Sequence, residues 1–574
     1  MKRKYLIIIA FFLLFPAQFC FLSACAPVAP IDGGLDGVSI AKDRSKDIYY
    51  HYMKGVLLSL DGDIDGAVEE YTEIIEMAGH VPLLMMELAT LHLENNEIDK
   101  ASATLKTLLE HNPNHYEALV MLGTIYGQSH EFEKAAHCYR KAIEASPDNP
   151  DIYFLLSILY KSQNDYDSAR EVLEELLKRD FENHMAAYQL AHIYIAMKNL
   201  DRAKYWLQRS LTIKPDFTGA LKDLAFINEH ETNKQEAISL YRRYLELKPY
   251  DIEIRVRLGN LLLNEGNYVE AAKEFESVID YGGISSDLEF SLAVAYFFGK
   301  INYDRAIDLF LEILDTNPGD DRARYFLAAS YHELGECEKA LEQFQSIGPS
   351  SDLYASSRIQ MALIYSESGD RERAVKIVEE TLENRNDDPN LYLALSTLYE
   401  EAEDLDSSVY VLERGLEILP GNTDIKYRLG FILEKTGDYE KAIALMRSIL
   451  EIDPENAEAM NFIGYTYADR GIHLDEAEKL ILEALRLKPG SGHIMDSLGW
   501  VYFRQERYNQ ALEYLEKAFE LMTNDPVVAE HLGQAYEKTG QPDQAIEMYR
   551  KALEKDPDNE DIIRRIESLE GKQP

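Results

Sequence analysis

The chain has 574 residues and combines 59 Lys and Arg with 101 Asp and Glu, which gives a formal net charge of −42. A surface this acidic repels the phosphate backbone, so a nucleic-acid partner is excluded. Only four cysteines occur, too few for a disulfide-stapled class, and no CxxC or HExxH string indicates a metal site.

Residues 1–24 have the composition of an export signal. A basic cluster at residues 2–4 precedes an apolar run at residues 5–15, and the string Leu-Ser-Ala-Cys ends at Cys25. This string resembles the bacterial lipobox, and the resemblance implies cleavage before Cys25 and acylation of that cysteine. Ala26, rather than Asp, follows it, which is similar to the outer-membrane sorting pattern. An uncleaved anchor and an ordinary secreted protein are the alternatives.

Residues 25–47 are expected to form the lipidated cysteine and a flexible tether. The stretch after Cys25 is rich in Pro, Gly, Asp and Ala and has no apolar period. About 21 fully extended residues reach at most ~70 Å. The tether would therefore let the folded part stand well away from the bilayer.

From residue 48 to residue 559 the sequence repeats with a period of 34 residues. Single insertions near residues 300–303 and 471–474 are the only changes of register. The fifteen rows begin at Ile48, Pro82, Tyr116, Pro150, His184, Thr218, Ile252, Ser286, Asp321, Ala355, Pro389, Thr423, Ala457, Gly492 and Pro526.

Each row has the features of two helices joined by a turn. The eighth place is always Gly, Ala or Ser, and twelve or thirteen residues later stands Ala in every row except the one with Ser408. Two helices approach closely only where the side chains between them are this small. Clusters such as Asn96-Glu97 end the first helix, and prolines such as Pro113 stop the second.

Ten rows also carry Tyr three residues after the small place, and this combination resembles the tetratricopeptide repeat. The resemblance implies an all-α, right-handed superhelical solenoid of about fifteen helix-turn-helix repeats over residues 48–559. The family's consensus Trp at the fourth place is missing throughout. In residues 560–574, Ile562, Ile566 and Leu569 share one helical stripe, which predicts a C-terminal capping helix followed by a short tail.

No catalytic, cofactor or metal site is predicted. The repeats leave no separate catalytic domain, and their helix faces show no nucleophile and base arrangement and no Gly-rich phosphate loop. Residues 61–66 resemble the first half of an EF-hand loop, but Thr72 stands where a bidentate Glu is required. Cys138 and Cys337, more than five repeats apart, are expected to be free thiols. An enzyme remains the class alternative.

In a tetratricopeptide solenoid the first helix of each unit lines an inner groove, into which its fifth and ninth places project. Contiguous apolar surface at such places usually marks a binding site. The alternative is that these side chains cover neighbouring helices. The resemblance assigns the partner-binding groove to Phe154, Tyr188, Phe226, Phe290, Tyr325, Tyr427, Phe431, Tyr465, Trp500 and Phe503.

Residues 461–471 and 496–502 resemble a signature of long outer-membrane tetratricopeptide lipoproteins of Gram-negative bacteria. That group includes scaffolds that bind a periplasmic carboxyl-terminal processing protease and present cell-wall hydrolases to it. The resemblance implies a non-enzymatic scaffold, lipid-anchored at the periplasmic face of the outer membrane, with envelope proteins as partners. Presentation of substrates to such a protease is the first hypothesis. An assembly factor for a pilus, secretin or exopolysaccharide export machine is the second.

Overall fold

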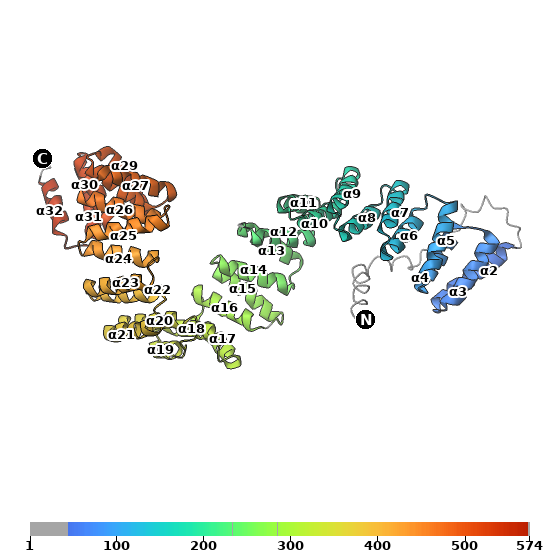
Figure 1. Ribbon diagram of the computed structural model, residues 1–574, viewed down its shortest axis with the longest axis horizontal. Helices are drawn as coiled ribbons and strands as arrows, with labels where there is room; N and C mark the ends of the chain where they lie inside the picture. Colours follow the sequence, from blue (N-terminus) through green and yellow to red (C-terminus); the bar gives the residue numbers. More distant parts are fainter. Residues whose placement is uncertain (1–43, 232, 284, 572–574) are drawn as a thin grey trace. The chain divides into compact units, whose positions relative to one another are not determined.

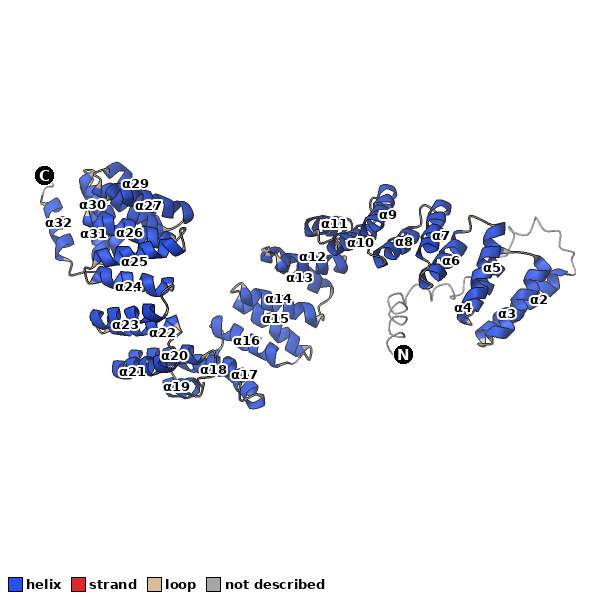
Figure 2. Cartoon of the chain, viewed as in Figure 1, coloured by secondary structure: helices blue, strands red, loops and turns tan. Residues whose placement is uncertain are grey.

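The computed structural model describes residues 44–231, 233–283 and 285–571. Helices dominate this part of the chain, and it contains no strand (Figure 2). None of its helices is both long enough and apolar enough to cross a membrane. The predicted signal peptide and the lipidation site Cys25 lie outside the described residues.

The helices fall into two compact units that meet in sequence between Asp251 and Ile252. The first unit holds α2 (Arg44–Leu60), α3 (Ile64–Ala78), α4 (Pro82–Glu94), α5 (Ile98–His111), α6 (Tyr116–Gln128), α7 (Phe132–Ala145), α8 (Pro150–Ser162), α9 (Tyr166–Arg179), α10 (His184–Ala196), α11 (Leu200–Ile213), α12 (Thr218–His230) and α13 (Lys234–Leu247). The second unit holds α14 (Ile252–Asn264), α15 (Tyr268–Asp280), α16 (Ser286–Phe298), α17 (Tyr303–Thr316), α18 (Asp321–Glu333), α19 (Cys337–Gln345), α20 (Tyr354–Glu367), α21 (Arg371–Asn384), α22 (Pro389–Glu401), α23 (Leu405–Ile418), α24 (Thr423–Lys435), α25 (Tyr439–Ile452), α26 (Ala457–Arg470), α27 (Leu474–Leu487), α28 (Gly492–Arg504), α29 (Tyr508–Leu521), α30 (Pro526–Lys538), α31 (Pro542–Leu553) and α32 (Glu560–Glu570).

The rows of the 34-residue period coincide with helix pairs. Every row except the first and the tenth begins at the first residue of a helix. Within each unit, consecutive helices pack against one another in the order of the sequence (Figure 1). The predicted all-α solenoid of helix-turn-helix repeats is therefore confirmed.

The small eighth place lets an aromatic ring of the second helix lie directly on the first. A Cβ at Gly259 would lie 2.5 Å from the nearest ring atom of Phe275, and a Cβ at Gly533 would lie 2.7 Å from the ring of Tyr549. Both rings are fully buried. Any larger side chain would displace them, which explains why the place is always small.

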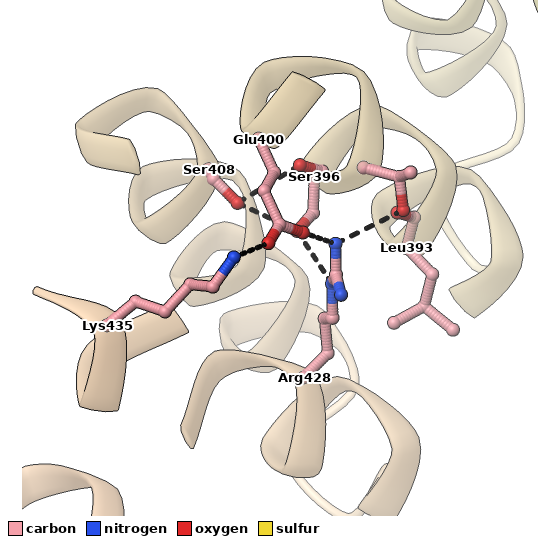
Figure 3. Close-up of polar contacts among 7 residues, drawn as sticks. Leu393, Ser396, Glu400, Ser408, Arg428 and Lys435 are labelled. Atoms are coloured by element: carbon pink, nitrogen blue, oxygen red, sulfur yellow. Dashed lines mark hydrogen bonds and ion pairs between the residues drawn. The ribbon is translucent and has the colours of Figure 1, made fainter. Parts of the chain in front are cut away.

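The one row without Ala on its second helix compensates with a second hydroxyl. Its eighth place is Ser396, and the Oγ atoms of Ser396 and Ser408 lie 2.8 Å apart (Figure 3). Both serines are fully buried, so each hydroxyl needs a hydrogen-bond partner. The paired hydroxyls preserve the close helix contact at this position.

The turn between the two helices of each repeat has a constant backbone conformation. Its fifteenth place has a positive φ angle in every row whose fifteenth place the structure describes. Glycine fits this left-handed region without strain, whereas a side chain does not. The place holds glycine at Gly62, Gly266, Gly335, Gly369, Gly437, Gly471 and Gly540, and another residue at Asn96, His130, Asn164, Lys198, Lys300, Glu403 and Glu506.

We expect Glu403→Gly to raise the free energy of unfolding by about 0.5–1 kcal/mol, because it relieves the strain of a side chain at φ +60°. The matched reverse change is Gly369→Ala, at φ +82°, where no atom lies within 4 Å of the added Cβ. In that variant the free energy of unfolding should fall by a similar amount. Urea unfolding followed by circular dichroism measures both, and two neutral variants would show that the turn is not strained.

Among the described residues, buried side chains form clusters that each span a few neighbouring helices, and partly buried side chains such as Phe462 pack against two clusters. The second unit contains clusters within residues 328–364, 355–442 and 446–569. The first contains clusters within residues 67–91, 85–138, 119–186 and 169–193. Helix α32 joins the cluster of residues 446–569 through Ile562 and Leu569, as its apolar stripe predicts.

Candidate functional site

The first helices of the last three repeats line an open pocket of about 500 Å³ in the second unit. Helices α26, α28 and α30 are neighbours, so residues one repeat apart face one another across it. The pocket is lined by Tyr465 and Asp469 of α26, Trp500, Phe503 and Arg504 of α28, and Val527, Glu530, His531 and Gln534 of α30. The structure thus brings together three residues assigned to the groove from sequence: Tyr465, Trp500 and Phe503.

Trp500 is sandwiched between two flat rings. Its ring centroid lies 4.1 Å from that of His531 and 4.9 Å from that of Phe503, with interplanar angles of 14° and 6°. Only 7% of Trp500 is exposed, less than the groove assignment led us to expect. Its buried indole Nε1 has no hydrogen-bond partner among the described residues. Trp500 therefore both lines the pocket and stabilises the packing of α28 on α30.

The orientation of His531 is fixed by a buried carboxylate. Its Nδ1 lies 3.0 and 3.1 Å from the two carboxylate oxygens of Asp496, and both side chains are 8% exposed. Because a carboxylate only accepts hydrogen bonds, Nδ1 is the donor. This bond keeps the imidazole ring parallel to the indole of Trp500.

Carboxylates surround the Tyr465 side chain. Burial raises the pKa of Tyr465, and the negative charges of Asp469, Asp496, Glu434 and Glu530 raise it further. Burial also raises the pKa of Glu434, and the nearby charge of Asp469 adds to that increase. The potential at this end of the groove is therefore negative.

Tyr427 and Phe431 form a second, more exposed part of the groove on α24. Their exposed fractions are 37% and 38%. Arg428 and Lys435 lie 5.9 and 5.4 Å from the Phe431 ring centroid, within the range of cation–π attraction. In contrast to the pocket at Tyr465, this part carries positive charge beside its aromatic rings.

Glu400 of α22 holds both cations in place (Figure 3). Lys435 donates to it at 2.5 Å, and the Arg428 guanidinium donates to its other oxygen. Arg428 Nε also donates to Ser396 Oγ at 3.3 Å, which links the network to the buried serine pair. The hydrogen bond from Lys435 and the charge of Arg428 hold the pKa of Glu400 below its ordinary value.

We expect Glu400→Gln to lower the free energy of unfolding by about 1–2 kcal/mol at pH 7, because it removes charged hydrogen bonds from a carboxylate that is 19% exposed. A lowered folded-state pKa stabilises the fold above the unfolded pKa of about 4.3, and this contribution disappears as the pH falls through the folded-state value. The deficit should therefore shrink below about pH 4. Exposed Glu417 on α23 provides the control Glu417→Gln, and urea unfolding at pH 7 and pH 3.5 gives the comparison. A pH-independent deficit would contradict the electrostatic explanation.

Phe290 and Tyr325, also in the second unit, pack largely on buried rings. The Phe290 centroid lies 5.9 Å from that of Phe310, and the Tyr325 centroid lies 5.3 Å from that of Phe344. Phe310 and Phe344 are fully buried, whereas Phe290 and Tyr325 are half-buried. One face of each of these two rings therefore covers a neighbouring helix, as the alternative to a groove role predicts.

The remaining assigned residues lie in the first unit. Phe154 is half-buried against two core clusters. Tyr188 lies edge-on to Phe217, with centroids 4.9 Å apart, and burial raises its pKa. Phe226 is 43% exposed and contacts the ring of His230. Of these three, Phe226 presents the most surface to a partner.

One group of side chains has the spacing of metal ligands. The ligand atoms of His51, Glu70 and Glu73 lie within 4.8 Å of one another. However, Lys54 Nζ lies 2.5 Å from Glu70, and His51 Nδ1 lies 2.7 Å from the same carboxylate. The Lys54 ammonium and the hydrogen bond with His51 already account for the Glu70 carboxylate in this cluster. Cys138 and Cys337, expected as free thiols, are indeed unbridged.

The aromatic part of the pocket could be read from the repeat, but its polar part could not. No sequence motif distinguishes His531 from the other histidines of the chain. The available signal was its place relative to Asp496: the fifth place of one row faces the sixth place of the next. Asp469 and Arg504 lie one turn beyond the ninth place and therefore outside the two places assigned to the groove.

Four segments match models of known families. Residues 68–216 match the tetratricopeptide domain of cytochrome c-type biogenesis protein H, and residues 296–352, 399–461 and 502–564 match tetratricopeptide repeat models. The chain is a tetratricopeptide-repeat protein. Proteins built from these repeats generally bind other proteins, and the repeat is typically a non-enzymatic scaffold.

Two curated relatives of this tetratricopeptide-repeat protein match short segments. It is 43% identical over 76 residues to the TPR repeat-containing protein PA4667 of Pseudomonas aeruginosa, a match covering 13% of each chain. It is 30% identical over 79 residues to the photosystem I assembly protein Ycf3 of a Synechococcus species, covering 13% of this chain and 46% of Ycf3. The matched segments thus span less than half of either relative.

Two solved structures are similar to the tetratricopeptide-repeat chain. Yeast Tom70 is 18% identical, and the match covers 80% of this chain and 95% of Tom70 with a TM-score of 0.37. The Cut9–Hcn1 hetero-tetramer of the APC/C is 16% identical, covering 79% and 96% with a TM-score of 0.36. The family assignment rests on the family models and the helix pairs.

Proposed function

We propose that this protein is a non-enzymatic scaffold that is anchored through Cys25 at the periplasmic face of the outer membrane and presents partner proteins to a periplasmic protease. The aromatic side chains on first helices carry the proposal. Phe226, Tyr427 and Phe431 are between 37% and 43% exposed, and Trp500 lines a pocket with two more aromatic rings. Aromatic side chains bury large areas at little entropic cost and dominate interface energies.

An assembly factor for an envelope export machine is the second candidate. Two matches favour it: residues 68–216 are similar to a domain of a cytochrome c biogenesis protein, and one relative is an assembly protein of photosystem I. Both names describe assembly of other proteins rather than proteolysis. The two candidates share the groove and differ in the partner that it holds.

A pull-down from envelope extract with the tagged full-length protein tests the scaffold function. The informative variant is Tyr427→Ala/Phe431→Ala, because both side chains are exposed enough to be removed without unfolding the chain. Tyr205→Ala/Tyr410→Ala is the matched control, since these tyrosines are 54% and 62% exposed on second helices. We expect the first double variant to lose partners that the second retains.

The identity of the recovered proteins separates the candidates. A processing protease supports the adaptor, and a secretin or polysaccharide porin supports the assembly factor. Recovery of no partner by the parent protein contradicts the scaffold function, and turnover of a substrate by the purified protein alone would assign it to the enzymes.

The lipid anchor is tested in a separate experiment. Cys25→Ala should abolish labelling with a radioactive fatty acid and release the protein from the membrane fraction.

A further inference from the structure

The pocket between α26, α28 and α30 has an excess of negative charge. Asp469, Glu530 and the nearby Glu434 are joined to no basic side chain by an ion pair among the described residues. Glu530 accepts a hydrogen bond from Gln534, which is neutral. The charges of Asp469 and Glu530, which line the pocket, therefore remain available to its occupant.

The positive groups near the pocket are engaged elsewhere. The Arg504 guanidinium donates to the backbone carbonyl of Asp469 and lies 5.8 Å from the Trp500 ring. His531 is held by the buried Asp496, and Lys435 is bound to Glu400 on the neighbouring part of the groove. Arg504 thus lines the pocket together with two carboxylates, Asp469 and Glu530, that have no ion-pair partner among the described residues.

Part of the pocket wall is aromatic. Tyr465, Trp500 and Phe503 line it, and an aromatic face attracts a cation through its quadrupole. Aromatic rings combined with carboxylates favour a positively charged group that is partly removed from water, and they disfavour a phosphate or a carboxylate. The volume of about 500 Å³ is within the range of sites that enclose one small ligand or one side chain.

We propose that this pocket binds an arginine or lysine side chain of the protein segment held in the groove. The proposal rests on the scaffold function proposed above and adds the chemistry of recognition. The acidic pocket anchors the basic residue, and the exposed rings of Tyr427 and Phe431 remain available to an apolar part of the same partner.

The two tryptophans of the chain, Trp206 and Trp500, make a direct measurement available. In full-length Trp206→Phe protein, fluorescence reports on the pocket alone. The probes are three N-acetylated, C-amidated peptides with the sequence Leu-X-Leu, in which X is arginine, lysine or citrulline. Citrulline has nearly the shape of arginine without its charge. We expect saturable changes in Trp500 emission with the arginine and lysine peptides, and at least tenfold weaker binding of the citrulline peptide.

Removal of the pocket charges gives the second comparison. Asp469→Asn/Glu530→Gln should weaken binding of the arginine peptide at least tenfold. Glu520→Gln/Glu554→Gln removes the same charge from exposed positions outside the pocket and should leave binding within twofold. Equal affinity for the arginine and citrulline peptides, or no saturable response to either charged peptide, overturns the proposal. The envelope pull-down is independent of this outcome: partners recovered by the parent protein would leave the scaffold function intact.

Discussion

Gly464→Val is expected to lower the free energy of unfolding of the residue 446–569 cluster by about 3 kcal/mol or more. A Cβ at Gly464 would lie 2.4 Å from Ile481 Cγ1 and 3.2 Å from the backbone oxygen of Ala477 on the adjacent helix α27. Ile481 and Ala477 are fully buried, so neither can move away without opening the cluster. Overpacking a core in this way costs about 1–3 kcal/mol for the first added atoms, and valine adds two further methyl groups.

The control is Gly490→Val in the loop before α28. No atom lies within 4 Å of a Cβ at Gly490, and its φ angle is not positive, so we expect a change within about 0.5 kcal/mol. Urea unfolding followed by Trp500 fluorescence in the Trp206→Phe background observes this cluster directly, because Trp500 belongs to it. A Gly464→Val protein as stable as the parent would show that the eighth place does not need to be small.

Trp500→Ala should remove both stability and binding. Truncation of a buried tryptophan costs about 3–5 kcal/mol, and the ring would leave a gap between Phe503 and His531. Loss of a hot-spot aromatic also costs at least about 2 kcal/mol of binding free energy. Circular dichroism gives the unfolding curve, and calorimetric titration with the arginine peptide gives the affinity.

Trp500→Phe separates the two effects. The phenyl ring keeps the stack and removes the indole Nε1 that lacks an acceptor, so we expect a loss of only about 1–2 kcal/mol in stability and retained peptide binding. If Trp500→Ala unfolds at the same urea concentration as the parent, the sandwiched packing does not stabilise the unit. If it keeps full peptide affinity, this end of the groove is not the binding site and Phe226 becomes the next residue to truncate.

The fold could be predicted from sequence because every repeat contains the same contacts between its two helices. The eighth-place glycines, the matching alanines and the helix-ending prolines each reflect a contact within one helix pair, and a local contact leaves a pattern at fixed spacing. The left-handed fifteenth place also depends on a contact within one repeat. Glycine at Gly369, Gly437 and Gly540 indicates the positive φ angle, whereas Glu403 and Glu506 at the same place do not.

The candidate site could be predicted only in part because it departs from the repeat. Tyr465 and Trp500 stand at a regular groove place, so the period locates them, but it does not indicate that Trp500 is 93% buried between two rings. The Asp496–His531 bond joins different places of successive rows, and no other pair of successive rows has Asp and His at these two places. Contacts that occur once have no period and become visible only in the structure.

The division of the core into clusters determines how the protein unfolds. A repeat array whose side chains contact only adjacent repeats loses structure segment by segment, because no single nucleus holds the whole chain. A damaged turn near residue 369 would loosen the clusters of residues 328–364 and 355–442 while the cluster of residues 446–569, which contains the pocket, stays folded. We therefore expect limited proteolysis to yield discrete folded fragments rather than an all-or-none loss of structure.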